Sequence, residues 1–313
     1  MKQRLLQIML FLSVGLLYAI RAFSYDVIVD GIYYNLVCYD GEKTVAEVTN
    51  NGEWTESYSG DLVIPSSIVV NGTNYPVNGI GNSAFQKCTY LNTISIPESV
   101  SLIDFYYGIG MTLFSDCINL SSITVSENNP NYCSVDGILY NKDKSALCCI
   151  PAKKEITTFN VPESVINVVC GAFAHCENLE YVTLPSSFNS LNDALFLGCT
   201  NLIYVSIPNK IDNIPNCLFS GCKSLKNVTI PNSVRTIGSY SFSNSGIESI
   251  ECPNSVTCIE EGAFSGCDNL TSITLGNSIS EIGYNAFDGC YNLNTVKISD
   301  LTAFCNINAF LVL

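Results

Sequence analysis

Cysteine is the residue type whose number and spacing raise the first chemical question in this sequence. The chain has 16 cysteines, and an even count usually suggests disulfides. Seven of them stand three residues after a phenylalanine: Cys88, Cys117, Cys176, Cys199, Cys222, Cys267 and Cys290. Parallel thiols repeated at one position fit disulfide geometry poorly, so we expect small buried hydrophobes with a weak S–H donor. No C-x-x-C occurs, which weakens a structural zinc site, and we predict neither a metal nor a cofactor.

The remaining cysteines are less determined by their spacing. Cys252 and Cys305 take positions that hold Ile or Val in other copies of the pattern, so we expect them in the core. A local disulfide stays open for Cys133, Cys148, Cys149 and Cys170.

Histidine and the acidic residues give no sign of a catalytic site. His175 is the only histidine and takes a turn position that other copies give to glycine, so we expect a tolerated exposed residue. The acids are scattered rather than paired, and neither G-x-G-x-x-G nor a P-loop is present. We therefore predict that the chain is not an enzyme. A polysaccharide-degrading enzyme built on a solenoid stays as an alternative, and it would need acids or bases clustered on one face.

The composition suits a large apolar core under a weakly charged surface. Of the 313 residues, 47% are hydrophobic and 13% are charged, and the formal net charge is −14. An acidic chain with a pI of about 4.3 repels phosphate backbones, so no nucleic acid is expected as a partner.

The first 24 residues have the pattern of a secretory signal. Lys2 and Arg4 precede an apolar run over residues 5–20, and Ala22 and Ser24 form an A-x-S cleavage pattern. A membrane anchor is the alternative, although 16 residues are short for a span. We predict a signal peptide over residues 1–24. No second apolar stretch could cross a membrane, so the chain should not be integral to the membrane after signal removal.

One pattern recurs along the rest of the chain. Its anchor phenylalanines are Phe85, Phe114, Phe173, Phe196, Phe219, Phe242, Phe264, Phe287 and Phe310, and from Phe173 onward their spacings are 23, 23, 23, 22, 23 and 23. A fixed period of this length is typical of a solenoid, in which each unit buries its apolar residues only against its neighbours. The repeated core positions are Phe85, Cys88, Leu91, Phe173, Cys176, Leu179, Phe196, Cys199, Leu202, Phe219, Cys222, Leu225, Phe264, Cys267, Leu270, Phe287, Cys290 and Leu293.

Each unit contains the signals for a strand, a turn and a return segment. The alternating L-x-x-I-x-I-P predicts a strand that the proline ends, S-V-x-x-I-G predicts a turn and a short extended piece, and x-x-A-F predicts a short helical turn. Stacked units would lie about 4.8 Å apart. A column of asparagines before the leucine should bond neighbouring backbone at the turn: Asn119, Asn178, Asn201, Asn269 and Asn292.

The motif A-F-x-x-C-x-x-L-x-x-I-x-I-P-x-S-V-x-x-I-G resembles the leucine-rich repeat of BspA-type bacterial surface proteins, over about residues 61–310. YDVIVDGIYY (residues 25–34) resembles the start of the mature chain in such proteins of the Bacteroidetes, and SVDGILYNKDKSALCCIP (residues 134–151) resembles their variant unit with a hairpin-like V-D-G-I-L-Y. The resemblance implies an α/β-type repeat solenoid, a right-handed coil with a parallel β-sheet face. It also implies a secreted or cell-surface protein, and some relatives are adhesins.

The expected organisation has three parts. After the signal peptide, residues 25–75 break the period and should form a β-rich N-terminal cap, because terminal units must shield the open core. Residues 76–313 should form the solenoid of units of about 23 residues, with a variant unit over residues 133–160 and an incomplete repeat at the end.

The candidate binding residues lie where the repeat leaves a choice of side chain. In the strand segments, two outward positions per unit form columns of mostly uncharged polar residues that include Tyr181, Tyr204, Thr183, Ser206, Asn227 and Thr229. Strand packing alone favours Ser and Thr there, but Tyr181 and Tyr204 could form an adhesive aromatic patch. The inserted loop with Phe105, Tyr106 and Tyr107 is a second candidate, unless it tucks against the neighbouring coil.

These features predict an extracellular binding module. The expected function is adhesion to a host matrix protein, another cell or a glycan, through the sheet face or the inserted loop. A structural spacer that binds no ligand tightly is the competing interpretation.

Overall fold

The computed structural model describes residues 25–39, 43–52, 56–82, 84–108, 111–298 and 308–309. The predicted signal peptide, residues 1–24, lies outside these ranges, as do Cys305 and Phe310. Within the described residues the chain forms strands and turns and no α-helix. None of its described segments is a helix of the length and hydropathy that a membrane crossing requires.

The N-terminal strands form a mixed sheet. Its order is β1–β2–β3–β6–β5, with β8 also paired to β6. Two-residue turns with positive φ at Asp30–Gly31 and Asn71–Gly72 close its β1–β2 and β5–β6 hairpins, as type I′ turns require. The strands are β1 (Val27–Val29), β2 (Ile32–Tyr39), β3 (Lys43–Val48), β5 (Ser67–Val70), β6 (Thr73–Ile80) and β8 (Leu102–Ile103).

The parallel sheet of the coils begins beside this N-terminal sheet. β4 (Gly60–Val63), β7 (Leu91–Ile96) and β11 (Ser122–Val125) pair in parallel, so β4 already stands in the ladder of the repeats. Between β8 and β11, the inserted residues form a small antiparallel hairpin of β9 (Tyr106–Gly108) and β10 (Met111–Thr112).

The variant unit contains the expected hairpin. β12 (Tyr132–Val135) and β13 (Ile138–Asn141) pair antiparallel around the positive-φ turn Asp136–Gly137. β13 then pairs antiparallel with β14 (Ala146–Cys149), which pairs in parallel with β16 (Asn167–Val168). This unit therefore returns the chain to the parallel arrangement of the coils that follow.

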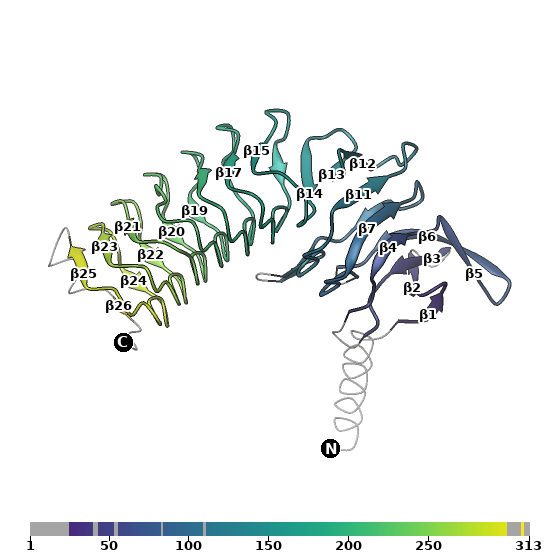
Figure 1. Ribbon diagram of the computed structural model, residues 1–313, viewed down its shortest axis with the longest axis horizontal. Coiled ribbons are helices and arrows are strands. Elements are labelled where there is room, and N and C mark those ends of the chain that lie inside the picture. Colours follow the sequence, from purple (N-terminus) through teal and green to yellow (C-terminus); the bar gives the residue numbers. More distant parts are fainter. Residues whose placement is uncertain are drawn as a thin grey trace, which may run out of the picture.

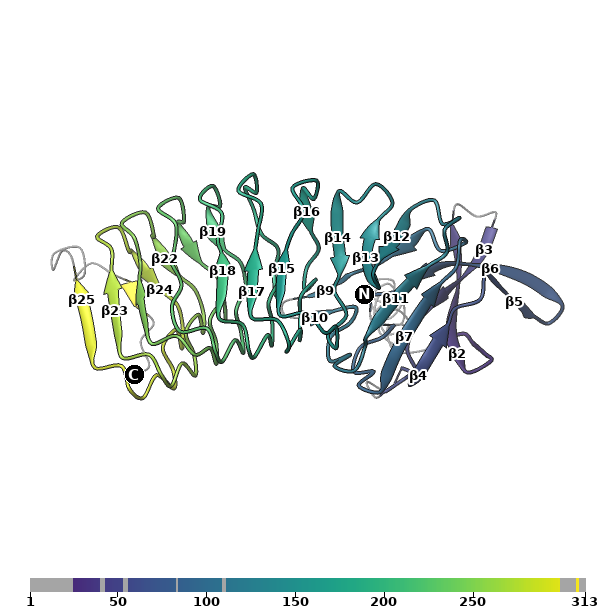
Figure 2. The same ribbon diagram turned by 45° about the horizontal axis from the view of Figure 1, so that its top comes forward.

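The C-terminal coils lie side by side in a curved row and carry two parallel ladders (Figures 1 and 2). The strand face holds β15 (Thr158–Asn160), β17 (Tyr181–Thr183) and β18 (Tyr204–Ser206), and separately β21 (Ser249–Glu251), β23 (Ser272–Leu275) and β25 (Thr295–Ile298). The second ladder confirms the short extended pieces: β19 (Asn213–Ile214), β20 (Thr236–Ile237), β22 (Cys258–Ile259), β24 (Glu281–Ile282) and β26 (Asn308–Ala309).

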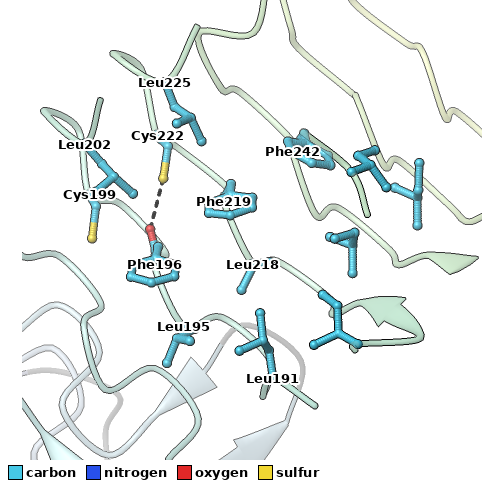
Figure 3. Close-up of a cluster of buried hydrophobic side chains, with 14 of the residues drawn as sticks. Leu191, Leu195, Phe196, Cys199, Leu202, Leu218, Phe219, Cys222, Leu225 and Phe242 are labelled. Atoms are coloured by element: carbon cyan, nitrogen blue, oxygen red, sulfur yellow. Dashed lines mark hydrogen bonds between the residues drawn. The ribbon is translucent and has the colours of Figure 1, made fainter. Parts of the chain in front are cut away.

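The anchor phenylalanines stack through the core. From Phe173 to Phe287, successive ring centroids lie 5.0, 5.6, 5.5, 5.2 and 5.4 Å apart, slightly more than the 4.8 Å expected of strands. Figure 3 shows Phe196, Phe219 and Phe242 in this row with the leucines beside them. The row is interrupted at the variant unit, where two hydrophobic clusters meet around Ile138 to Cys149.

The expected short helical turns are wrong. From Phe173 to Phe287, the segment around each anchor phenylalanine is a turn with left-handed residues two positions before and two positions after the ring. Ala194 and Gly198 (φ 56° and 69°) flank Phe196, and Cys217 and Gly221 (φ 55° and 76°) flank Phe219. A right-handed helix cannot continue through a left-handed residue, so each turn closes after one i+3 hydrogen bond.

Replacing a central phenylalanine should cost more than replacing one at the end of the row. Phe219 is fully buried between two rings, so Phe219→Ala should lower the free energy of unfolding by about 3–5 kcal/mol. Phe287 is only half-buried, so Phe287→Ala should cost less. Urea denaturation followed by circular dichroism measures both, and equal losses would show that the row does not carry the core.

Candidate functional site

The cysteine column has a specific hydrogen-bonding role. In successive coils the thiol donates to the carbonyl of the anchor phenylalanine one coil earlier, with Sγ–O distances of 3.0 Å for Cys199 to Phe173 and 3.1 Å for Cys222 to Phe196 (Figure 3). The same carbonyl of Phe196 also accepts the N–H of Cys199 in its own coil, at 3.2 Å. Both lone pairs of that buried oxygen are thus satisfied. The position needs a small side chain with a donor, which explains cysteine.

All 15 cysteines in the described residues are free thiols, including the four for which the sequence left a disulfide open. Two of those, Cys133 and Cys170, donate to the carbonyls of Asn141 (3.2 Å) and Asp193 (2.9 Å). Burial raises the pKa of the Cys199 and Cys252 thiols to about 12, which disfavours the reactive thiolate. The column is therefore structural. Where the chain is described, no three His, Cys, Asp or Glu side chains gather as a metal would require.

His175 takes the left-handed position that glycine holds in other coils, as expected, with φ at 60°. Its Nε2 lies 3.6 Å from Oδ1 of Asp116, which holds the same position (φ 63°) in an earlier coil. The ring also covers Gly198, where an added Cβ would lie 2.6 Å from Nδ1. The imidazole is therefore half-buried rather than exposed, contrary to expectation, because its neighbours in the stacked turns cover it. It faces an acid rather than a nucleophile.

The two candidate tyrosines stand in register on the parallel sheet. Tyr181 pairs with Tyr204, and Thr183 pairs with Ser206, so the structure brings these four side chains together. The tyrosine side chains are 42% and 54% exposed. Thr158 and Asn160 of β15 begin the same two columns and were not predicted from the sequence. The stretch TFNVPESV matches the strand motif with Phe159 and Val161 at the buried positions, and that signal could have found them.

Asn227 and Thr229 do not continue this ladder, contrary to expectation. The segment Asn227–Ile230 forms no strand, and the sheet is broken between β18 and β21. Around this break, the described backbone makes no hydrogen bond from Asn227–Ile230 to either neighbouring coil. Both side chains are exposed.

The break accompanies the one short unit, the 22 residues from Phe242 to Phe264. One residue is missing from its turn, where Gly246 donates its N–H to the Cys222 carbonyl at 3.0 Å. A Cβ on Gly246 would lie 2.0 Å from the Lys223 carbonyl oxygen, so only glycine fits this close approach.

The missing residue also interrupts the asparagine column. Four side chains of that column donate to the preceding coil's turn carbonyl, as predicted: Asn119 to Thr89 (2.7 Å), Asn178 to Lys154 (3.2 Å), Asn201 to Glu177 (2.8 Å) and Asn292 to Asp268 (2.6 Å). The fifth, Asn269, follows the shortened turn and makes no such bond within the described residues. The one-residue deletion therefore marks a local fault in an otherwise periodic array.

A groove lies over the broken sheet. Its cavity volume is about 790 Å³, and a second hollow of about 500 Å³ adjoins it through Asn232, Glu251 and Pro253. The polar residues that line the larger hollow are Tyr204, Ser206, Asn209, Asn227, Thr229, Asn232, Ser249 and Glu251. Four of the predicted binding residues thus belong to one concave site, while Tyr181 and Thr183 flank it.

The inserted hairpin is separate from this groove. Phe105 is half-buried and packs against the N-terminal core, so it tucks against the coil rather than projecting from it. Tyr106 and Tyr107 lie on β9, and their side chains fall outside the described residues.

A family model of the BspA type leucine rich repeat region matches six copies in residues 66–134, 151–257 and 235–311, more than half of the chain. The chain belongs to the BspA-type leucine-rich repeat family. No curated protein sequence matches it.

Solved structures of bacterial leucine-rich repeat proteins resemble this BspA-type chain. A protein from Eubacterium ventriosum is 22% identical over 88% of this chain and 95% of its own, with a TM-score of 0.57, which supports the repeat fold. One from Bacteroides ovatus is 25% identical over 91% and 78%, with a TM-score of 0.48. A leucine rich cell surface protein from Faecalibacterium prausnitzii is 18% identical over 90% and 97%, with a TM-score of 0.47.

The buried thiols should make the stability of this BspA-type protein fall in alkali. An unfolded cysteine has a pKa of about 8.5, whereas the folded pKa of Cys199 is raised to about 12, so folded protein holds a proton that the unfolded chain releases. The stabilisation that comes from this raised pKa of Cys199 is complete below about pH 8.5 and is lost as the pH rises toward 12. Cys199→Ser should reduce the pH slope of the unfolding free energy by up to about 1.4 kcal/mol per pH unit. Denaturation between pH 8 and pH 10.5 tests this, with the exposed Cys38→Ser as control; equal slopes in wild type and Cys199→Ser would contradict it.

Restoring glycine at position 175 should stabilise the fold. His175→Gly removes a left-handed non-glycine residue and should raise the free energy of unfolding by about 1 kcal/mol, since the long, partly exposed contact to Asp116 contributes little. Gly221→Ala is the reciprocal control, because a Cβ there has room (3.4 Å to Gly198) and only the φ of 76° opposes it. The melting temperature should rise for His175→Gly and fall for Gly221→Ala. A lower melting temperature for His175→Gly would mean that the imidazole contacts outweigh the backbone strain.

Proposed function

We propose that this BspA-type chain is a secreted or cell-surface binding module that acts in adhesion, through the strand face of its C-terminal coils. Proteins of this family are typically non-enzymatic binding modules, and its structural relatives include a bacterial cell-surface protein. The partner would be an extracellular-matrix protein, another cell's surface or a glycan.

The observation that carries this proposal is the pair of exposed tyrosines, Tyr181 and Tyr204, in register on neighbouring parallel strands. A tyrosine offers a rigid apolar ring with a hydrogen-bonding tip, and tyrosines are enriched where proteins bind partners. The hydroxyl side chains of Thr183 and Ser206 lie beside them in the next column. Such a surface can bury an aromatic anchor within a polar rim.

The organisation proposed for the remaining parts follows from location outside the cell. Residues 1–24 would direct export and be removed, and residues 25–75 would cover the open end of the solenoid core. The inserted hairpin of β9 and β10 would supply a second contact at the edge of the N-terminal coils.

Removing both tyrosine rings should weaken binding by at least tenfold, because two central aromatic anchors together contribute more than about 1.4 kcal/mol. The measurement is surface binding of the chain to immobilised fibronectin, fibrinogen and a glycan array, for wild type and Tyr181→Ala/Tyr204→Ala. A matched control is Tyr284→Ala/Tyr291→Ala, which removes two tyrosines that are 53% and 88% exposed elsewhere.

The possible outcomes distinguish the strand face from the inserted hairpin, and an adhesin from a structural spacer. Loss only in a deletion of residues 105–108 would place adhesion on the inserted hairpin. No binding to any of these surfaces, with an intact fold by circular dichroism, would favour a structural spacer over an adhesin.

A further inference from the structure

Most polar side chains of the groove between β18 and β21 have no partner inside the protein; Ser206 differs, because its Oγ accepts the N–H of Leu184 at 2.9 Å. No hydrogen bond is formed by the side chains of Tyr204, Asn209, Asn227, Thr229, Asn232 or Ser249, all within the described coils. The equivalent columns of the N-terminal coils are satisfied across strands, by Thr93 to Asp61 (2.8 Å) and Ser95 to Thr124 (3.0 Å). Cross-strand bonds satisfy those hydroxyls, whereas the side chains of the groove are left open to solvent or a ligand.

The backbone of the groove floor adds further unpaired groups. Asn227–Ile230 forms no ladder, so its N–H and C=O groups are not used by β18 or β21. Amides, hydroxyls and peptide groups together can both donate and accept hydrogen bonds within one hollow of about 790 Å³. A ligand that fits must carry many donors and acceptors at short spacing.

The charge of the groove selects among such ligands. Glu251 is the one ionisable acid or base that lines it, and no lysine or arginine does. The chain as a whole has a formal charge of −14, so phosphate, sulfate or sialic acid groups would meet repulsion without a compensating cation. The ligand should therefore carry no anionic group.

The aromatic wall indicates a ring with an apolar face. Tyr204 forms one side of the groove and Tyr181 lies next to it in register. A sugar ring presents C–H groups on one face and hydroxyls on its edge, which matches an aromatic plane beside amides and hydroxyls. An extended peptide would instead pair with a regular strand edge and seat alternate side chains in pockets, and the floor at Asn227–Ile230 is not a strand.

We propose that this groove, residues 204–209, 227–232 and 249–253, binds a neutral oligosaccharide. The proposal rests on the adhesive function above and names the ligand class for the same face. The sugar rings stack along Tyr181 and Tyr204, and their hydroxyls bond the unpaired amides and hydroxyls of the sheet break.

The test uses the full chain and an array of short neutral oligosaccharides of glucose, mannose, galactose and xylose, with sulfated and sialylated glycans on the same array. Titration calorimetry with the best neutral probe gives Kd. Thr229→Ala/Ser249→Ala should raise that Kd at least tenfold. Ser272→Ala/Thr295→Ala makes the same kinds of change in the outward columns beyond the groove and should leave Kd within twofold.

Two readouts do not depend on the variants. Binding of a neutral probe should be the same at low and high salt, because no charge pair contributes. Backbone amide signals of Asn227–Ile230 should shift on titration, whereas those of β7 and β11 should not.

The possible failures are distinct. Binding of charged glycans only, binding of peptides or matrix proteins only, neutral-sugar binding unaffected by Thr229→Ala/Ser249→Ala, or no neutral-sugar binding at millimolar probe would each overturn the inference. If matrix protein binds and is lost in Tyr181→Ala/Tyr204→Ala, the adhesive function stands while the glycan site fails. If no surface of any kind binds, both fail.

Discussion

The carbonyl oxygen of the anchor phenylalanine is the atom on which the stacking of the coils depends. It is buried beside its own ring, so both of its lone pairs need donors. At Phe173 and Phe196 the N–H of the cysteine three residues on supplies one, and the thiol of the next coil supplies the other; the Phe219 carbonyl, for which the next coil has Ser245 in place of cysteine, is an exception. Because the second donor comes from the neighbouring unit, each coil is completed only by the next. The stacked rings and the thiol bonds therefore act together at each step from coil to coil. A single unit alone would lack the donor that its neighbour supplies.

Periodicity of this kind predicts most of the fold from sequence. A spacing of 23 residues at Phe196, Phe219 and Phe242 fixes which side chains meet, and the buried columns follow. The turns were less predictable, because a short return segment such as x-x-A-F can be either a helical turn or an irregular one. The left-handed residues that forbid a helix include Ala194 and Cys217, which carry no sequence signal for positive φ. Their conformation is imposed by the stacked neighbours rather than chosen by the residue type.

The candidate site was predicted in part, and the reason lies in a single missing residue. Tyr181 and Tyr204 follow the period and lie where the pattern places them. Asn227 and Thr229 follow it too, yet their strand does not form. The sequence shows that the spacing after Phe242 is 22 residues. It does not show whether the missing residue changes only the turn or also the adjacent strand. That depends on how closely Gly246 approaches Lys223, which is a contact between coils.

A regular solenoid satisfies its own polar groups, because each column of donors faces a column of acceptors one coil away. The asparagine, cysteine and strand ladders all show this, and each is interrupted around the short unit, where Ser245 replaces cysteine and its hydroxyl meets the Cys267 thiol at 3.5 Å. The groups left over at such a fault are the ones free to bind something else. These side chains are exposed, so water satisfies them in the free protein, and a ligand with matching donors and acceptors can replace that water.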